Sequence, residues 1–152
     1  MNNLLVEPHG GELVDLTVGE ERHDLLKEIA LKLPDVTLNE RQLCDLECLA
    51  SGIFSPLRGF MDRSDYESVL DRMRLQDGTL WPIPICLDLP ETAAENLEAG
   101  QSMALRDAEG FLLAILHIND LWQIDKQKEA LQVYGVAEKS HPGVEYLFDK
   151  TG

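Results

Sequence analysis

The sequence predicts an α+β domain with a small, strongly bent β-sheet or barrel and several flanking helices. Three observations predict this fold class. The chain has 152 residues, of which 44% are hydrophobic and 27% charged. This length and composition are typical of one globular domain, and we predict a single domain over residues 1–152. Candidate strands and helices follow one another without the regular strand–helix–strand repeat of parallel α/β proteins. A run of strand-like segments fills much of the second half.

The first predicted elements are a strand and a helix. Residues 10–18 (GGELVDLTV) alternate and are rich in β-branched residues, which favours a strand after a Gly-Gly turn. Residues 19–33 place apolar side chains three and four apart, the spacing of one helix face, and Pro34 ends the helix. The expected buried face consists of Leu25, Leu26, Ile29, Ala30 and Leu33.

Residues 35–38 form a short predicted strand, and two capped helices follow. Asn39 with Gln42 three residues later is a capping-box pattern, and this helix ends near Gly52. Its expected buried face is Leu43, Leu46, Leu49 and Ala50. Ser64 with Glu67 predicts a second capping box at the start of the next helix.

The second half begins with a turn at Asp77-Gly78 and an extended segment in which Pro82 and Pro84 restrict pairing to a strand start, bulge or sheet edge. A short helical turn follows and ends at Gly100. Residues 101–120 predict a hairpin with its turn at 107–110 and a longer, buried second strand. Residues 125–135 predict a short helix, and the tail ends in a helical fragment.

The charge balance excludes some partners. The chain has 28 acidic and 13 basic residues, a net charge of −15, which repels nucleic acid and anionic membranes. The first residues lack a signal-peptide pattern, and the longest apolar run (111–116) is too short to span a bilayer. Three cysteines without a secretory signal fit a reduced cytoplasm.

Few residues suggest chemistry, and the usual phosphate-binding loops are missing. Cys44 and Cys48 lie four apart on a predicted helix and could bind zinc with Cys86 and a histidine, or serve as small apolar residues. His117 falls in the strand expected to be buried, where a structural role is favoured. His141, in a His-Pro-Gly loop, is a better functional candidate, although a structural role is favoured there too.

Residues 52–61 (GIFSPLRGFM) concentrate apolar side chains in a loop. Gly52 can end the preceding helix in a left-handed turn, Pro56 fixes the backbone, and Gly59 permits a bend. Two interpretations remain: the apolar side chains plug the interior, or some form a docking face. The side chains concerned are Ile53, Phe54, Leu57, Phe60 and Met61. Arg58 and His141 are weak candidates for an anion site.

The run GIFSPLRGFMDRSDYESVLDRMRLQDGTLWPIPICLDL (52–89) resembles the amino-terminal domain of ATP sulfurylase (sulfate adenylyltransferase). The flanks agree in order: PHGGELVDL (8–16), LRDAEGFLLAIL (105–116) and VYGVAEKSHPGVEYLF (133–148). The resemblance implies a PUA-like fold and a parent enzyme that transfers the adenylyl group of ATP, with Mg²⁺, to sulfate. It also implies a cytoplasmic, homo-oligomeric parent, with a catalytic domain that follows residue 152 and packs against this one.

The resemblance assigns no catalytic, cofactor-binding or metal-binding residue to this chain, because the family's catalytic motifs, such as Q-x-R-N-P-x-H-x-x-H, do not occur in it. We therefore expect the chain alone to be inactive. The chain departs from the family at Val136, Ala137 and Glu138, which weakens a polar role for that loop. The family landmarks, expected to be structural, are Gly52, Phe54, Ser55, Pro56, Leu57, Gly59, Phe60, Met61, His141, Pro142 and Gly143.

Two rival functions remain. A stand-alone module could bind an anionic nucleotide or a protein partner through the loops bearing Arg58 and His141. An RNA-binding module, suggested by the PUA-like fold alone, is opposed by the net charge of −15. The apolar trio Tyr146–Phe148 close to the last residue leads us to expect that the natural polypeptide continues.

Overall fold

The computed structural model describes residues 6–149. The chain divides into two units, each assembled from separate stretches of sequence. The first unit contains residues 1–60 and 102–116, and the second contains residues 61–101 and 117–152. Helices and a sheet occur together, as the α+β prediction requires. Within the described residues the sheet has three strands and is open, so the barrel alternative is wrong for this range.

The sheet combines distant parts of the sequence in the order β1-β2-β3. Its strands are β1 (Asp35–Thr37), β2 (Ser102–Arg106) and β3 (Leu112–His117). β1 runs parallel to β2, with Val36 opposite Leu105. The N–H of Leu38 donates to the carbonyl of Arg106 at 2.8 Å and extends this pairing. The predicted strand at 35–38 and the hairpin with its turn at 107–110 are therefore confirmed.

The buried strand of the hairpin is β2, whereas the sequence predicts burial for its partner. Met103, Ala104 and Leu105 are almost completely buried. β3 is only half-buried, and Phe111 just before it is exposed. β2 lies between two strands, while β3 lies at the edge of the sheet. Position in the sheet, which hydrophobicity alone does not reveal, decides the difference.

The helices of the first unit begin with η1 (His9–Gly11) and η2 (Glu20–Arg22), which leads directly into α1 (His23–Ala30). The predicted capping box then starts α2 (Glu40–Ala50). The Asn39 side chain accepts from the Gln42 N–H at 2.9 Å, and the Gln42 side chain accepts from the Asn39 N–H at 3.0 Å. Gln42 is buried, as is Leu49 further along the helix, so the cap is also part of the core.

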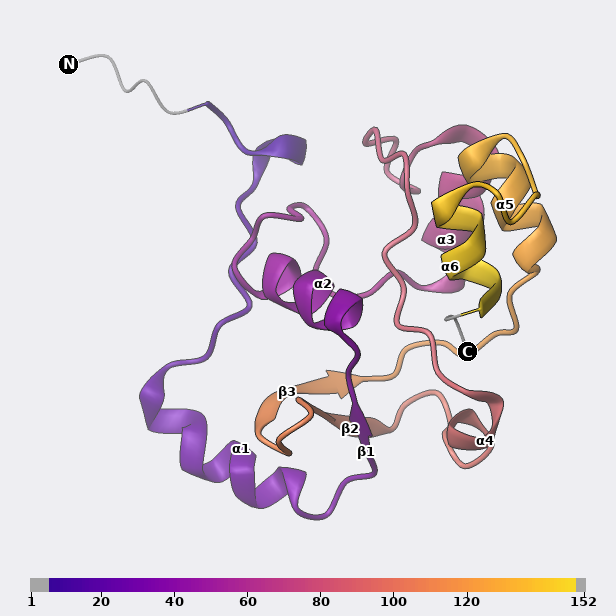
Figure 1. The fold of residues 1–152 in the computed structure, drawn as a ribbon. Coiled ribbons are helices and arrows are strands. Elements are labelled where there is room, and N and C mark those ends of the chain that lie inside the picture. The colour runs from indigo at the N-terminus through magenta and orange to yellow at the C-terminus, as the bar shows by residue number, and fades with distance from the viewer. Residues whose placement is uncertain (1–5, 150–152) are drawn as a thin grey trace. The chain divides into compact units, whose positions relative to one another are not determined.

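The predicted strand at 10–18 is wrong. Its first two residues belong to η1, and residues 12–19 are extended without pairing to a strand. Figure 1 shows this segment as an unbroken extended trace between η1 and α1. Two backbone N–H groups bond instead to the end of α2 and the loop after it: Val14 to the Ser55 hydroxyl, and Leu16 to the carbonyl of Ala50.

The predicted apolar face of α1 is only partly buried. Ala30 is buried, and Leu26 and Leu33 are half-buried. Leu25 and Ile29, on the other side of the same face, are 58% and 41% exposed. The first unit therefore covers one edge of this amphipathic helix.

The second unit contains α3 (Arg63–Arg72), α4 (Glu91–Ala94), α5 (Lys126–Tyr134) and α6 (Pro142–Asp149). Asp62 caps α3 by accepting from the Asp65 N–H at 2.9 Å, so the predicted Ser64–Glu67 capping box is wrong. The Ser64 hydroxyl bonds to Asp62, and Glu67 pairs with Arg63. The bond from the Asp65 N–H, together with the bond from Ser64, holds the pKa of Asp62 below its usual value.

α5 and α6 pack against each other around Ala130, Val144 and Leu147, all buried. Half-buried apolar residues, among them Val136 and Ala137, complete this cluster. The departure from the family pattern at these two positions therefore places apolar side chains where the second unit uses them for packing. Leu147 and Phe148 of the apolar trio belong to the same cluster, so packing inside the unit accounts for them.

The segment after α3 reverses at the predicted turn, where the Asp77 side chain accepts from the Thr79 N–H at 2.8 Å. One isolated bridge joins Arg74 and Leu80. The described residues after it form no strand until β2, consistent with the prolines at 82 and 84, which lack an N–H to donate. In the described range, no helix has the length and apolar character needed to cross a membrane.

Candidate functional site

The motif that begins at Gly52 contacts residues 8–16 within the first unit, and we name residues 8–16 and 52–58 together the interlock. Its centre is the buried hydroxyl of Ser55. This hydroxyl accepts from the Val14 N–H at 2.9 Å and donates to the carbonyl of Gly52 at 2.6 Å. One hydroxyl therefore holds the loop closed and fixes the N-terminal segment to it.

Two glycines make the close approach in the interlock possible. Gly52 has φ +83°, and a Cβ there would lie 2.6 Å from the carbonyl oxygen of Val14. Gly10 has φ +76°, and a Cβ there would lie 2.7 Å from the ring of Pro56. A side chain at either position would combine an unfavourable backbone conformation with a steric clash. The prediction of a left-handed turn at Gly52 is confirmed.

The apolar side chains of the motif do not all point inward. Leu57 and Met61 are buried, and Phe54 and Phe60 are half-buried. Ile53 is 71% exposed, so its predicted place in an internal plug is wrong. Gly59 lies at the expected bend. The motif combines core residues with an exposed apolar side chain, so the internal plug describes only part of it and the docking face stays a prediction.

Arg58 lies on the surface of the interlock. Its Nη2 is 2.8 Å from Oε2 of Glu12, and both side chains are 66% exposed. An exposed pair of this kind contributes about 0–1 kcal/mol. The guanidinium therefore joins the two halves of the interlock weakly and already has a carboxylate partner.

His141, in the second unit, caps α6. Its Nδ1 accepts from the Gly143 N–H at 3.2 Å, and its carbonyl accepts from the Glu145 N–H at 2.9 Å. Pro142 follows at the first helical position, where its missing N–H costs nothing. The ring also lies 4.9 Å from that of Tyr134. These contacts give the His-Pro-Gly sequence a structural role.

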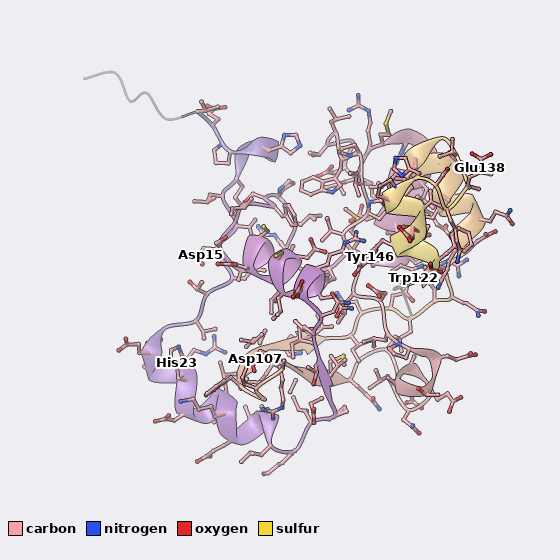
Figure 2. All side chains as sticks on the ribbon, viewed as in Figure 1. Asp15, His23, Asp107, Trp122, Glu138 and Tyr146 are labelled. Atoms are coloured by element: carbon pink, nitrogen blue, oxygen red, sulfur yellow. The ribbon has the colours of Figure 1, made fainter. Side chains whose placement is uncertain are left out.

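A polar contact that no sequence pattern indicates joins α3 and α5. The buried Tyr66 hydroxyl donates to Glu129 at 2.8 Å, and the Tyr66 ring lies 5.5 Å from that of Trp122. Burial first, and then the charge of Glu129, raise the pKa of Tyr66 far above its usual value, so the phenol stays protonated. Figure 2 labels Trp122, whose buried indole N–H has no hydrogen-bond partner among the described residues.

The cysteines do not form a metal centre in the described part of the chain. Cys44 and Cys48 belong to the first unit and Cys86 to the second, and none of the three forms a disulfide within the described residues. No group of three or more His, Cys, Asp or Glu side chains between residues 6 and 149 is placed to hold a metal ion. Burial, with smaller contributions from neighbouring acidic groups, raises the pKa of Cys48, which disfavours its thiolate.

Comparison with known proteins identifies the fold family of the chain. The model of the PUA-like domain family matches residues 6–152. The chain belongs to the PUA-like domain family. A solved structure, the hexameric APS kinase from Thiobacillus denitrificans, matches 79% of this PUA-like chain with a TM-score of 0.72 and 43% identity. The predicted fold family is therefore confirmed.

Curated relatives extend the comparison. The chain is 45% identical over 143 residues to the probable bifunctional SAT/APS kinase 2 of Sorangium cellulosum. It is 46% identical over 147 residues to the sulfate adenylyltransferase of Aspergillus fumigatus. Each match covers 94% of this chain but only 25% of the relative. The PUA-like chain thus spans about a quarter of the length of these relatives, and the resemblance to sulfate adenylyltransferases is confirmed.

Replacing Ser55 tests the interlock. We expect Ser55→Ala to lower the free energy of unfolding by about 2 kcal/mol, because it leaves the buried Val14 N–H without an acceptor. Chemical denaturation measures the change. Ser51→Ala is the matched control, since in the described part of the chain its exposed hydroxyl bonds only to the Glu47 carbonyl of the preceding helix. We expect a change within about 0.5 kcal/mol. Equal effects of the two variants would contradict the role of Ser55.

Replacing His141 separates a cap from an anion site. We expect His141→Ala to lower the free energy of unfolding by about 1 kcal/mol through loss of the cap. His141→Asn, whose side-chain oxygen can accept the same N–H, should keep most of it. Thermal melts with and without added sulfate measure both effects. If the wild type is stabilised by sulfate and both variants lose that stabilisation, His141 binds an anion and the structural assignment is wrong.

Proposed function

We propose that residues 1–152 form the single, non-catalytic amino-terminal PUA-like domain of a sulfate adenylyltransferase. The parent enzyme would transfer the adenylyl group of ATP to sulfate, releasing pyrophosphate. One observation carries this proposal: each match to a relative includes 94% of this chain but only 25% of the relative's own length. A match of this kind indicates one domain of a larger enzyme. The family model, which spans residues of both units, supports treating them as one domain.

The roles of the motif residues support a non-catalytic domain. The Ser55 hydroxyl is occupied by two backbone groups, and the His141 ring by the start of α6. Arg58 is paired with Glu12. A nucleophile, general base or anion clamp needs polar groups that are free to meet a substrate. ATP and Mg²⁺ would therefore be bound by the part of the parent that follows residue 152.

The domain's role would be to pack against the catalytic part of the parent and support it. Exposed apolar side chains in both units, such as Leu25 and Leu131, provide surface that such packing could cover. The relative from Thiobacillus denitrificans is described as hexameric, and we propose that the parent is also a homo-oligomer. We also propose that the domain acts in the cytoplasm, and its net charge of −15 would repel nucleic acid and anionic membranes.

Deleting the domain from the parent tests this function. We expect the parent without residues 1–152 to melt at least about 2 °C lower, because losing an interface of about 1 kcal/mol lowers the melting temperature of a domain of about 150–250 residues by about 2–4 °C. We also expect slower sulfate-dependent release of pyrophosphate from ATP. The isolated chain should release none under the same conditions. Unchanged melting and turnover after deletion would contradict the supporting role, and turnover by the isolated chain would contradict the non-catalytic assignment.

A further inference from the structure

The extended segment before α1 has one occupied side and one open side. The N–H groups of Val14 and Leu16 point toward the unit, bonding to Ser55 and Ala50. In an extended chain, the backbone groups of alternate residues point to opposite sides. Those of Leu13 and Asp15 therefore point away from these partners. We name Leu13 through Thr17 the 13–17 edge.

The open side of the 13–17 edge has unused hydrogen-bonding capacity. Among the described residues, the backbone N–H and C=O groups of Leu13 and Asp15 have no hydrogen-bond partner, and both residues are exposed. The N–H of Thr17 is taken by the Asp15 side chain, which also accepts from the Thr17 hydroxyl. Leu13 and Asp15, which are two positions apart, could thus form four backbone hydrogen bonds with a neighbouring strand, two from each residue.

The sequence of the edge is that of a paired strand, although it has no strand partner here. Alternation and β-branched residues predict a strand at 10–18. Around the edge, Leu13 is 64% exposed, Leu16 39% and Val18 41%. An extended segment with β-propensity, exposed apolar side chains and free backbone groups is the type of surface that accepts an added strand.

We propose that the 13–17 edge accepts a β-strand from the catalytic part of the parent polypeptide, with a Lys or Arg opposite Asp15 and an apolar side chain opposite Leu13. This inference rests on the proposed function, since it requires a polypeptide that continues beyond residue 152. Opposite charges paired across strands stabilise a sheet, and a tethered strand pairs at high effective concentration.

The charge of Asp15 selects this occupant over a second copy of the chain. Hydrogen bonds from the Thr17 hydroxyl and N–H hold the pKa of Asp15 below its usual value, so the side chain is ionised at neutral pH. Figure 2 shows Asp15 on the segment that precedes α1. Antiparallel self-pairing through Leu13 and Asp15 of both copies would set each carboxylate opposite a leucine. It would also bring together two chains of charge −15.

Hydrogen exchange of the intact parent tests the proposal residue by residue. We expect the Leu13 and Asp15 amides to exchange at least about 100-fold more slowly than in an unstructured peptide, because they are paired in a ladder. The Val14 amide, which bonds to Ser55, is the internal reference for protection supplied by this chain itself. Free exchange at Leu13 and Asp15 in an intact parent with a protected Val14 would overturn the proposal.

A charge variant tests the chemistry of the occupant. Asp15→Asn retains an acceptor for Thr17 but removes the charge. We expect the Leu13 and Asp15 amides of this variant to exchange about two- to fivefold faster than in the wild type, which is the effect of losing one cross-strand charge pair. Asp24→Asn on α1 is the matched control and should change nothing, since among residues 6–149 the Asp24 carboxylate pairs with Lys27 alone, at 3.6 Å. Exchange unaffected by Asp15→Asn would overturn the basic partner.

Cross-linking from a photoreactive residue at position 13 identifies the partner. Cross-links to the same polypeptide beyond residue 152 would support the proposal, and cross-links to residue 13–17 of another copy would overturn it. A different result would contradict the proposed function: deletion of residues 1–152 that changes neither the melting temperature nor the turnover of the parent enzyme. A parent that depends on the domain but leaves Leu13 and Asp15 unprotected would contradict the strand addition alone.

Discussion

The Ser55 hydroxyl is the contact on which the order of the first unit depends. It connects two segments that are 41 residues apart, and both of its hydrogen bonds are to backbone groups. Gly52 lacks the Cβ that would keep the Val14 carbonyl away, and Gly10 lacks the one that would meet Pro56. The spacing of the motif thus reflects the need to bring two backbones together. The free backbone groups of Leu13 and Asp15 follow from this, because Val14 and Leu16 fix which side of the segment faces the unit.

Elements with local signals could be predicted from the sequence. The capping box at Asn39 and Gln42, the turn at Asp77 and the hairpin turn at 107–110 each depend on side chains within a few residues of the backbone they bond. The strand expected at 10–18 depended on a distant partner that the described residues do not supply. The cap of α3 was misplaced by two residues, because Asp62 and Ser64 both fit the local pattern and only Asp62 accepts from the helix. The more hydrophobic strand of the hairpin proved to be the edge strand, a matter of sheet order.

The candidate site was harder to predict because the same residue types serve chemistry and backbone capping. His141 was a weak functional candidate in a loop, and Ser55 was expected only to be structural. The hydrogen bonds that define their roles became visible only with Val14 and Gly143 in place. The contact between Tyr66 and Glu129 joins residues 63 apart, and no sequence pattern links them. The exposure of Leu25 and Ile29 could not be predicted from the sequence either, since both belong to the same apolar helix face as the buried Ala30.

We propose above all that this PUA-like chain is one domain of a larger enzyme whose chemistry lies elsewhere in the polypeptide. The most direct test is the size of the natural protein in its own cells, measured by immunoblot with an antibody raised against this chain. We expect a band well over twice the 17.1 kDa of the 152 residues, because the chain spans only 25% of the length of its relatives. A single band at 17.1 kDa would contradict it, and the domain would then have to act alone.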